Sequence, residues 1–284
     1  GVAASETASG RADGSGSIAA VRIVSLNAWG GAMYDELAAW LPRCEADIVC
    51  LQEVTRTPGF CEWTHFADGE RSLPQRANLF DDVRAALPHH QGVFVACDAG
   101  PVRDQGGRAH RQDFGLALFV HERLPVIGQV ARFVHGSFAD HDRWAIADRP
   151  RLAQGVRVVD RANDRTVSVV HLHGLRDPLG KGDTPARRAQ ADRLAEVVTE
   201  LRAPGDLTVV AGDFNVLPDS ETFAVLGAIG LVDLVRDADT RTSRYAKPTR
   251  HADYLLVSDP GAVARFEIVA APEVSDHRPL LLDL

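Results

Sequence analysis

The stretch from Thr208 to Pro218 has the sequence Thr-Val-Val-Ala-Gly-Asp-Phe-Asn-Val-Leu-Pro, and it decides how the rest of the chain is interpreted. Its first half is a short apolar run rich in valine, the pattern of a buried β-strand. The run stops at Gly212, and Asp213 and Asn215 follow where the strand ends. Because residues two apart in an extended chain point to the same side, a carboxylate and a carboxamide would face one cleft. Taken alone, these residues fit an ordinary turn equally well.

Other stretches repeat this arrangement of an apolar run with an acidic, amide or histidine side chain at one end. Each of them separately has an ordinary explanation as a turn, a cap or a solvated strand end. Together they bring residues suited to metal binding and to acid–base chemistry to strand termini, which indicates one shared functional site. The residues concerned are Asn27, Glu53, His171, His173, Asp253, Asp276 and His277.

Three motifs in these stretches carry a resemblance to a known family. They are Leu-Gln-Glu ending at Glu53, Gly-Asp-Phe-Asn ending at Asn215 and Ser-Asp-His ending at His277. In this order they resemble the endonuclease/exonuclease/phosphatase superfamily, and the resemblance extends from about Val21 to Leu284. It implies an α/β fold of the deoxyribonuclease type, a four-layer sandwich in which two stacked mixed β-sheets are flanked by helices. It also implies hydrolysis of phosphate esters with a divalent metal.

The expected metal ligands are oxygen donors. Mg²⁺ prefers carboxylate, carboxamide and water oxygens, and Glu53, Asn27 and Asp276 offer such groups. The family resemblance implies that Glu53 is the principal ligand and that Asn27 lies close by or acts through water. We therefore expect Mg²⁺, or Mn²⁺ in its place, as the cofactor.

The remaining motif residues are expected to carry the catalytic steps. By resemblance to the family, Asp213 orients or activates the attacking water, and Asn215 hydrogen-bonds to the phosphoryl oxygens. His277 resembles the family's catalytic histidine, which is usually assigned as the general base. Asp253 would accept a hydrogen bond from the other ring nitrogen of His277, which would fix the tautomer and raise the pKa of the imidazole.

Two histidines are candidates for contact with the substrate phosphate. His171 and His173 are two apart and share one face of the expected strand. His173 is favoured because it is nearer the strand end and precedes Gly174, whereas His171 is expected to be its neighbour in the cleft or a hydrogen-bonded core histidine. Lys181, which lies between two glycines, is a further candidate contact to phosphate and equally a solvated loop residue.

Composition favours one globular domain. The chain has 284 residues, of which 45% are hydrophobic, enough for a single α/β domain over residues 20–284. Residues 1–19 are mostly small and polar and are expected to form a disordered tail. The formal net charge of −8 lacks the basic excess of a typical nucleic-acid-binding protein. Nucleic acid is therefore a less favoured substrate class, and we expect a monomer.

The four cysteines fit no zinc-binding spacing. Reduced thiols in a cytoplasmic enzyme are the default interpretation, and a Cys44–Cys61 disulfide in an exported protein is the alternative. No stretch approaches the roughly 18 apolar residues of a membrane-spanning helix. The start of the sequence lacks the apolar segment of a signal peptide.

Local patterns predict the order of helices and strands. Residues 55–75 are expected to be irregular, and residues 98–112 and 236–250 to form arginine-containing loops that set specificity. Strands near 252–257, 264–270 and 279–284 are expected to complete a second sheet. The other expected elements are helices near 33–42, 76–87, 185–202 and 219–228, and strands near 21–27, 47–53, 92–97, 114–120, 126–134, 156–159 and 167–173, with a further strand ending at Asp213.

The expected activity is hydrolysis of a phosphodiester by in-line attack of an activated water. A small-molecule phosphomonoesterase is the alternative among enzymes. A binding module that kept the fold and lost activity is an alternative from another class, and it is disfavoured because Glu53, Asp213, Asp253 and His277 are all present. The sequence contains no long basic insertion of the kind that grips duplex DNA, so the substrate stays open.

Overall fold

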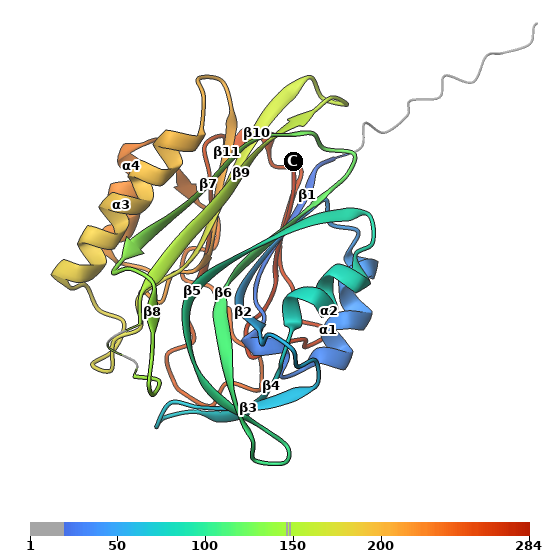
Figure 1. Ribbon diagram of the computed structural model, residues 1–284. Helices are drawn as coiled ribbons and strands as arrows, with labels where there is room; N and C mark the ends of the chain where they lie inside the picture. The colour runs from blue at the N-terminus through green and yellow to red at the C-terminus, as the bar shows by residue number, and fades with distance from the viewer. Residues whose placement is uncertain (1–19, 146, 148) are drawn as a thin grey trace, which may run out of the picture.

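The computed structural model describes residues 20–145, 147 and 149–284, and the tail expected over residues 1–19 lies outside the described residues. Two β-sheets face each other, and helices cover the outer face of each sheet (Figure 1). The layers are therefore helices, sheet, sheet and helices, which confirms the four-layer α/β sandwich. The strands of the first sheet are β1 (Arg22–Asn27), β2 (Ile48–Arg56), β3 (Trp63–Ala67), β4 (Ser72–Arg76), β5 (His90–Asp104), β6 (Ala109–His121), β8 (Ala139–Asp140), β14 (Arg265–Ile268) and β15 (Leu280–Asp283).

The first sheet has the order β14-β15-β1-β2-β6-β5-β3-β4, with β8 paired to β5. β1 and β2 run parallel, so that Asn27 at the carboxyl end of β1 pairs with Gln52 in the middle of β2, next to Glu53. β15 and β6 flank this parallel pair in antiparallel orientation. A parallel pair at the centre of a sheet brings two strand ends to the same edge.

The second sheet repeats this design. Its order is β12-β13-β11-β10-β9-β7, and β10 and β11 run parallel, with His173 paired to Asp213. β13 runs antiparallel to β11, so that Asp253 at its start also lies opposite Asp213. The strands are β7 (Val126–His135), β9 (Arg151–Asp160), β10 (Arg165–His173), β11 (Leu207–Asp213), β12 (Val232–Asp233) and β13 (Asp253–Val257).

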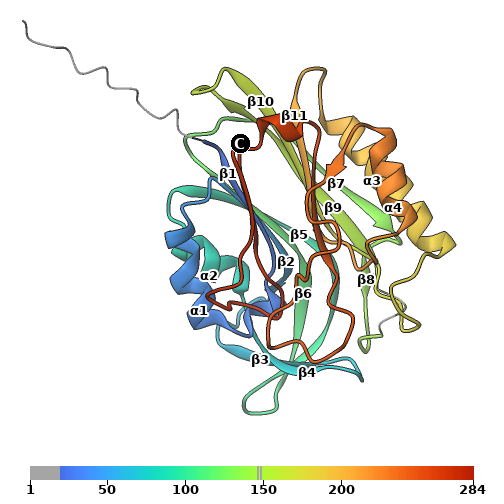
Figure 2. The ribbon, with the colours of Figure 1, turned by 180° about the vertical axis from the view of Figure 1, so that it is seen from behind.

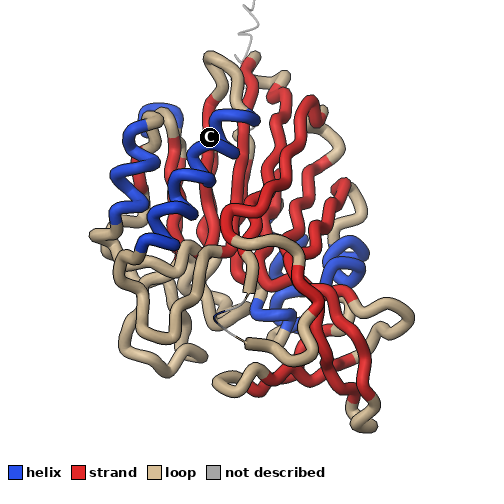
Figure 3. The backbone as a smooth tube through the Cα atoms, turned by 60° about the vertical axis from the view of Figure 1, so that its left-hand side comes forward, coloured by secondary structure: helices blue, strands red, loops and turns tan. Residues whose placement is uncertain are grey.

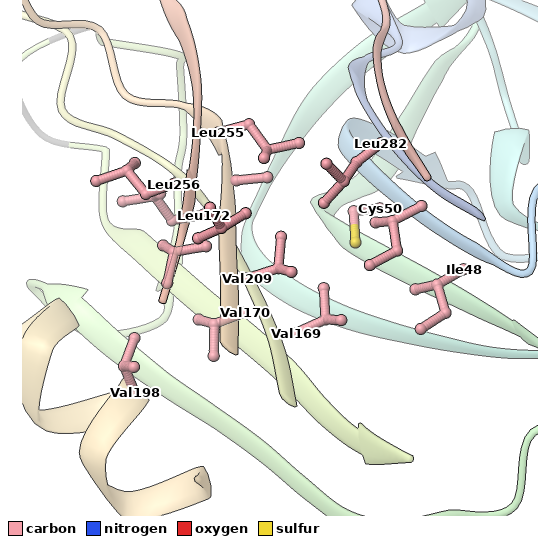
Figure 4. Packing of buried hydrophobic residues seen from close by; sticks show 14 of the residues in the cluster. Ile48, Cys50, Val169, Val170, Leu172, Val198, Val209, Leu255, Leu256 and Leu282 are labelled. Atoms are coloured by element: carbon pink, nitrogen blue, oxygen red, sulfur yellow. The ribbon is translucent and has the colours of Figure 1, made fainter. Parts of the chain in front are cut away.

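The core lies between the two sheets. Ile48 and Cys50 of β2 approach Val169 and Val209 of the second sheet, and Leu282 of β15 extends the same layer (Figure 4). All five side chains are fully buried. Burying a side chain of this size contributes on the order of 1.5–3 kcal/mol. The apolar runs identified in the sequence therefore hold the sheets face to face and fix the position of their strand ends.

The helices cover the outer faces. α1 (Tyr34–Trp40) and α2 (Leu79–Ala86) pack on the first sheet, and α3 (Pro185–Leu201) and α4 (Glu221–Ala228) on the second. Figure 3 shows the strands between these helices, with long loops gathered at one end of the sandwich. Thr184 caps α3, since its side chain accepts a hydrogen bond from the Arg187 amide. Short 3₁₀ turns lie at Trp29–Gly31, Leu41–Cys44 and Pro260–Ala262.

Three expectations about local structure are wrong. Residues 55–75 contain the β3–β4 hairpin, and residues 98–112 lie mostly in the β5–β6 hairpin. The first segment is polar because alternate residues face solvent, as in β3, where Thr64 and Phe66 are buried and His65 and Ala67 are exposed. In the second segment Asp98 is buried and paired with Arg149, and most of the exposed residues surround the hairpin turn. β14 and β15 join the first sheet next to β1 instead of completing the second sheet.

Two further sequence expectations concern cysteines and membranes. Cys44, Cys50, Cys61 and Cys97 carry free thiols in the described part of the chain, and Cys44 is buried whereas Cys61 is exposed. Among the described residues, no helix is both long and apolar enough to span a membrane.

Candidate active site

The strand ends that carry the sequence motifs meet at one edge of the sandwich. Asn27 at the end of β1 donates from Nδ2 to Oδ2 of Asp213 at the end of β11, with a separation of 3.0 Å, and this hydrogen bond joins the two sheets. His173 Nε2 lies 3.7 Å from the same Asp213 oxygen and 3.8 Å from Oε1 of Glu53. Residues more than 180 positions apart thus form one cluster.

The cluster is buried and strongly acidic. Four carboxylates in a space shielded from water repel each other, so that cations must compensate them. Arg71 and Arg241 do so from two different loops, contacting Glu53 and Asp276 respectively. Each of the following expected site residues is at most 8% exposed: Asn27, Glu53, His173, Asp213, Asn215, Asp253, Asp276 and His277.

Glu53 occupies an irregular point of β2. The register between β2 and β6 shifts between Leu51 and Val54, and Glu53 has a positive φ of 54°, a conformation that costs a non-glycine residue energy. Oε1 accepts a hydrogen bond from Arg71 at 3.3 Å, whereas Oε2 is buried without a partner among the described residues. Burial alone would raise the pKa of Glu53, but Arg71 and further nearby cations outweigh it and lower the pKa.

The end of β11 has a backbone that only glycine allows. Gly212 has φ of 138°, and a Cβ atom there would lie 2.2 Å from the carbonyl oxygen of Leu172. The chain then turns so that the Asn215 amide donates to Oδ1 of Asp213 at 3.1 Å, and Asn215 Nδ2 donates to the Gly174 carbonyl at 3.3 Å. The backbone conformation of the Gly-Asp-Phe-Asn motif therefore holds Asp213 and Asn215 side by side at the edge of the second sheet.

His277 and Asp253 form a hydrogen-bonded pair. Nδ1 of His277 lies 2.9 and 2.8 Å from the two Asp253 oxygens, while Nε2 lies 2.5 Å from Nη1 of Arg241. Because a guanidinium only donates, Nε2 is the acceptor and the proton is on Nδ1. Burial and then Arg241 lower the pKa of His277 to about 4. The raised pKa that Asp253 led us to expect from the sequence is wrong in direction, because burial and Arg241 outweigh the nearby carboxylates.

His171 belongs to the core and not to the acidic cluster. Its side chain is fully buried, with Nδ1 3.0 Å from Nε2 of Gln52 and Nε2 3.1 Å from Oε1 of Gln154. Both ring nitrogens are thus occupied by glutamine side chains. Of the two alternatives for this residue, the structure favours the hydrogen-bonded core histidine, and we give His171 no catalytic role.

The burial of His171 predicts a pH-dependent stability. Burial lowers the pKa of His171 to about 3, whereas an unfolded histidine titrates near 6.5. Below pH 6.5 the unfolded chain gains a proton that the folded chain excludes, so the free energy of unfolding should fall by up to about 1.4 kcal/mol per pH unit from this group. In urea melts between pH 6 and 4, the free energy of unfolding of His171→Gln should depend less steeply on pH, by up to that slope. The exposed His89→Gln is the control, and equal slopes in both variants would contradict the assignment.

Sequence reasoning missed several cations at the site. Arg71 lies in a segment expected to be irregular, and Arg151 was not singled out because it precedes the strand expected near 156–159. Arg241 was noted only as part of a loop. Lys181, which was left between two interpretations, donates to the His251 carbonyl, and burial lowers its pKa to about 8.

A sandwich of two facing β-sheets, with carboxylates, amides and a histidine–aspartate pair at the joined strand ends, defines a class of phosphoesterase folds. The model of the Endonuclease/Exonuclease/phosphatase family matches residues 24–277. The chain belongs to this family, whose members are phosphoesterase hydrolases. A search of curated proteins finds no match.

Solved structures with the same fold come from distant sequences. An endonuclease/exonuclease/phosphatase from Bacteroides vulgatus is 20% identical with a TM-score of 0.63, covering 93% of this chain and 98% of that chain. A mannosyl-6-phosphatase from Bacteroides thetaiotaomicron is 17% identical with a TM-score of 0.63, covering 92% and 98%. The catalytic domain of human Nocturnin with a bound sulfate anion is 17% identical with a TM-score of 0.64, covering 93% of each chain. At these identities the comparisons establish the fold.

Proposed function

We propose that this protein is a divalent-metal-dependent hydrolase that cleaves phosphate esters by in-line attack of water. The observation that supports this most is the joined cluster itself. The Asn27–Asp213 hydrogen bond ties the sheets together beside the His277–Asp253 pair, and Glu53 adds a buried carboxylate oxygen with no partner among the described residues. Acid, base and a free oxygen ligand within one buried cluster are what such a hydrolysis requires.

His277 is the proposed general base. Asp253 holds the proton on Nδ1 and leaves the Nε2 lone pair available to accept a proton. Nε2 lies 3.7 Å from Oδ2 of Asp213, a distance at which one water can hydrogen-bond to both groups. That water loses its proton to Nε2 as its oxygen bonds to phosphorus. The leaving alkoxide departs on the opposite side and takes a proton from solvent as the ester bond breaks, and Nε2 later releases its proton to solvent. Arg241, which donates to Nε2 at 2.5 Å, must first turn toward the phosphoryl group.

Asn215 and His173 are proposed to hold the phosphoryl oxygens. Asn215 is fixed by its backbone hydrogen bond to Asp213 and has φ of 54°, so its carboxamide is positioned before substrate binds. His173 lies across the cluster, with Nε2 facing Glu53 and Asp213. Donors placed in advance stabilise the charge that develops on the phosphoryl oxygens without reorganising during the reaction.

The proposed metal site is centred on Glu53. Its Oε2 is buried and unpartnered among the described residues, whereas Asn27 uses both ends of its carboxamide and Asp276 accepts from Arg241. Glu53 would therefore be the principal ligand. Asn27 and Asp276 would complete the site after giving up their present hydrogen-bond partners. When bound, a divalent cation neutralises phosphoryl charge and favours ionisation of water. Asp213, Asp253 and His277 also lie close enough to hold a cation, but the hydrogen bonds between His277 and Asp253 support a role in proton transfer for these two residues.

The loops that meet beside the buried cluster, here called the rim, favour small esters or the ends of chains as substrates. Glu70, in the turn between β3 and β4, accepts a hydrogen bond from Arg176 at 2.7 Å and lies 3.6 Å from Lys247. Arg71 of the same turn reaches inward to Glu53. Figure 2 shows the orange-to-red segment that follows α4 approaching the β3–β4 hairpin. Three segments thus meet over the buried cluster, where an open groove for duplex nucleic acid would require them to be apart.

Opening this rim should widen the range of substrates. Glu70→Ala removes both contacts and is expected to raise kcat/KM for a single-stranded oligonucleotide relative to p-nitrophenyl phosphate several-fold. Exposed ion pairs contribute little, so the free energy of unfolding should change by less than about 1 kcal/mol. Glu200→Ala, which removes an exposed ion pair with Arg132 on another face, is the matched control. A wild type that cleaves duplex DNA as readily as small aryl phosphates would contradict the closed rim.

A phosphomonoester is the second candidate substrate, and the cations support it. Lys181 and Arg241 both act electrostatically on Asp213 and Asp253, so two positive charges lie where a dianionic phosphate would bind. The mannosyl-6-phosphatase with the same fold is consistent with such chemistry on this scaffold. A phosphodiester carries one negative charge and needs fewer cations than a phosphomonoester. The ratio of phosphomonoesterase to phosphodiesterase activity therefore shows whether Lys181 and Arg241 serve a dianionic or a monoanionic substrate.

A substrate panel tests the proposed function. The purified protein, supplied with Mg²⁺ or Mn²⁺, is assayed with bis-p-nitrophenyl phosphate, p-nitrophenyl phosphate, sugar phosphates, sphingomyelin, RNA, and single- and double-stranded DNA. Asp213→Asn, prepared identically, is the control for contaminating hydrolases. Metal-dependent cleavage of at least one ester by the wild type alone supports the proposal. No cleavage of any ester would favour a binding module with this fold.

A further inference from the structure

Arg151, the first residue of β9, is a buried cation without an acidic partner. Its side chain is 4% exposed, and no carboxylate lies within ion-pair distance of it in the described part of the chain, where its Nε also lacks a hydrogen bond. Arg149, two residues earlier, is equally buried but pairs with Asp98 through two hydrogen bonds of 2.8 and 3.0 Å. A buried charge without a partner is costly, so Arg151 calls for a functional explanation that Arg149 does not.

The side chain that Arg151 contacts is His173. Nη1 of Arg151 lies 3.4 Å from Nδ1 of His173, while Nε2 on the opposite side of the ring faces the carboxylates of Glu53 and Asp213 at 3.8 and 3.7 Å. A guanidinium can only donate, and carboxylates can only accept. Nδ1 is therefore the accepting nitrogen, and the single proton of the neutral ring is on Nε2.

We propose that Arg151 is a positioning residue that fixes His173 as a neutral imidazole with its proton on Nε2, so that His173 can only donate a hydrogen bond toward the phosphoryl group. Protonation of Nδ1 would set an N–H group against the guanidinium N–H groups, so the geometry disfavours the imidazolium.

The two histidines of the site thereby have opposite tautomers. His277 has a carboxylate at Nδ1 and leaves Nε2 to accept a proton, whereas His173 has a cation at Nδ1 and carries its proton on Nε2. The imidazole of His277 therefore acts as a base, and the imidazole of His173 acts as a fixed hydrogen-bond donor. The charge of the group at Nδ1, a carboxylate for His277 and a guanidinium for His173, decides between the two roles. His173 accordingly takes no part in general acid or base catalysis.

The tautomer can be measured without any substrate. In protein labelled with ¹⁵N-histidine, two-dimensional ¹H–¹⁵N spectra at neutral pH distinguish a protonated from an unprotonated ring nitrogen, and the signals of His173 are assigned from their loss in His173→Asn. The wild type should show a protonated Nε2 and an unprotonated Nδ1. Arg151→Met should give a mixture of tautomers, and Arg151→Lys, which keeps a donor, should restore the wild-type pattern. Arg157→Met, on the same strand with a partly buried pairing to Asp206, should leave it unchanged.

The kinetic experiment rests on the proposed function, because it requires an ester that the protein hydrolyses. The spectra require no substrate and do not rest on it. Arg151→Met should lower kcat by about 10–100-fold, the range for removal of an outer partner of an active group, with KM little changed and partial recovery in Arg151→Lys. A wild-type His173 protonated on Nδ1 or on both nitrogens would overturn the proposal, even if Arg151→Met does not fold. An unchanged tautomer and unchanged kcat in a folded Arg151→Met would also overturn it. A correct tautomer in a protein that hydrolyses none of the esters would contradict only the proposed function.

Discussion

His277→Asn is expected to lower kcat for phosphate-ester hydrolysis by roughly 10²–10⁴-fold, the usual contribution of a positioned general base. Nε2 of His277 is the accepting nitrogen closest to Asp213, and Asp253 fixes its tautomer from behind. An asparagine cannot accept the proton of the attacking water. Steady-state kinetics with the ester that the wild type cleaves best, together with thermal melts, measure the loss and show that the fold persists.

Two companion variants isolate the cause of that loss. Asp253→Asn should reproduce much of it, because an amide can donate to Nδ1 and so permit the wrong tautomer of His277. His89→Asn should behave like the wild type, since this histidine is exposed and lies outside the cluster. A His277→Asn variant that retains more than half of the wild-type kcat would exclude His277 as the base.

Glu53→Gln is expected to weaken Mn²⁺ binding at least about 10–100-fold, since a direct ligand should matter no less than an outer-shell partner, whose loss has this effect. Its Oε2 is the buried carboxylate oxygen that lacks a partner among the described residues, and the amide that replaces it carries no charge. Calorimetric titration of EDTA-treated protein with Mn²⁺ measures the change. Glu122→Gln, with an exposed side chain, controls for the loss of one acidic group. Identical titrations for wild type and Glu53→Gln would remove Glu53 from the metal site.

The strand-end residues could be predicted from the sequence for a physical reason. Parallel strands bring their carboxyl ends to a common edge, so Asn27 lies near Glu53 in one sheet and His173 lies near Asp213 in the other. That the two edges meet was implied by the family resemblance of the motifs. The structure joins them through a 3.0 Å hydrogen bond between Asn27 and Asp213. The choice between His171 and His173 also follows from distance to the strand end, and the structure places His171 between Gln52 and Gln154.

The cations at the site could not be predicted in this way. Arg71, Arg151 and Arg241 come from a hairpin turn, the start of a strand and a loop, and each meets a site residue far away in the sequence. Nothing in their local sequence reports those partners. The pKa of His277 was predicted in the wrong direction for the same reason, because burial and Arg241 are tertiary effects that outweigh the neighbouring carboxylates.

The edge strands show the same limit. β3 alternates between buried and exposed residues, and the second half of β5 contains the buried Asp98 among small residues. Neither segment therefore has an apolar pattern strong enough to distinguish a strand from a loop. β14 and β15 were recognised as strands, but the sheet that they join depends on pairing with β1, more than 230 residues earlier. The local sequence pattern therefore predicts whether a segment forms a strand, whereas pairing with distant strands determines which sheet it joins.

The most direct test of the account is hydrolysis by protein that has been stripped of metal with EDTA, dialysed and then given Mg²⁺ or Mn²⁺. The assay follows bis-p-nitrophenyl phosphate and p-nitrophenyl phosphate, with wild type and Asp213→Asn prepared side by side. We predict no hydrolysis by the stripped wild type, recovery on addition of metal, and no recovery in Asp213→Asn, whose carboxylate joins the two sheets beside His277. Full activity of the stripped wild type, or equal recovery in Asp213→Asn, would contradict a metal-dependent phosphoesterase site at this cluster.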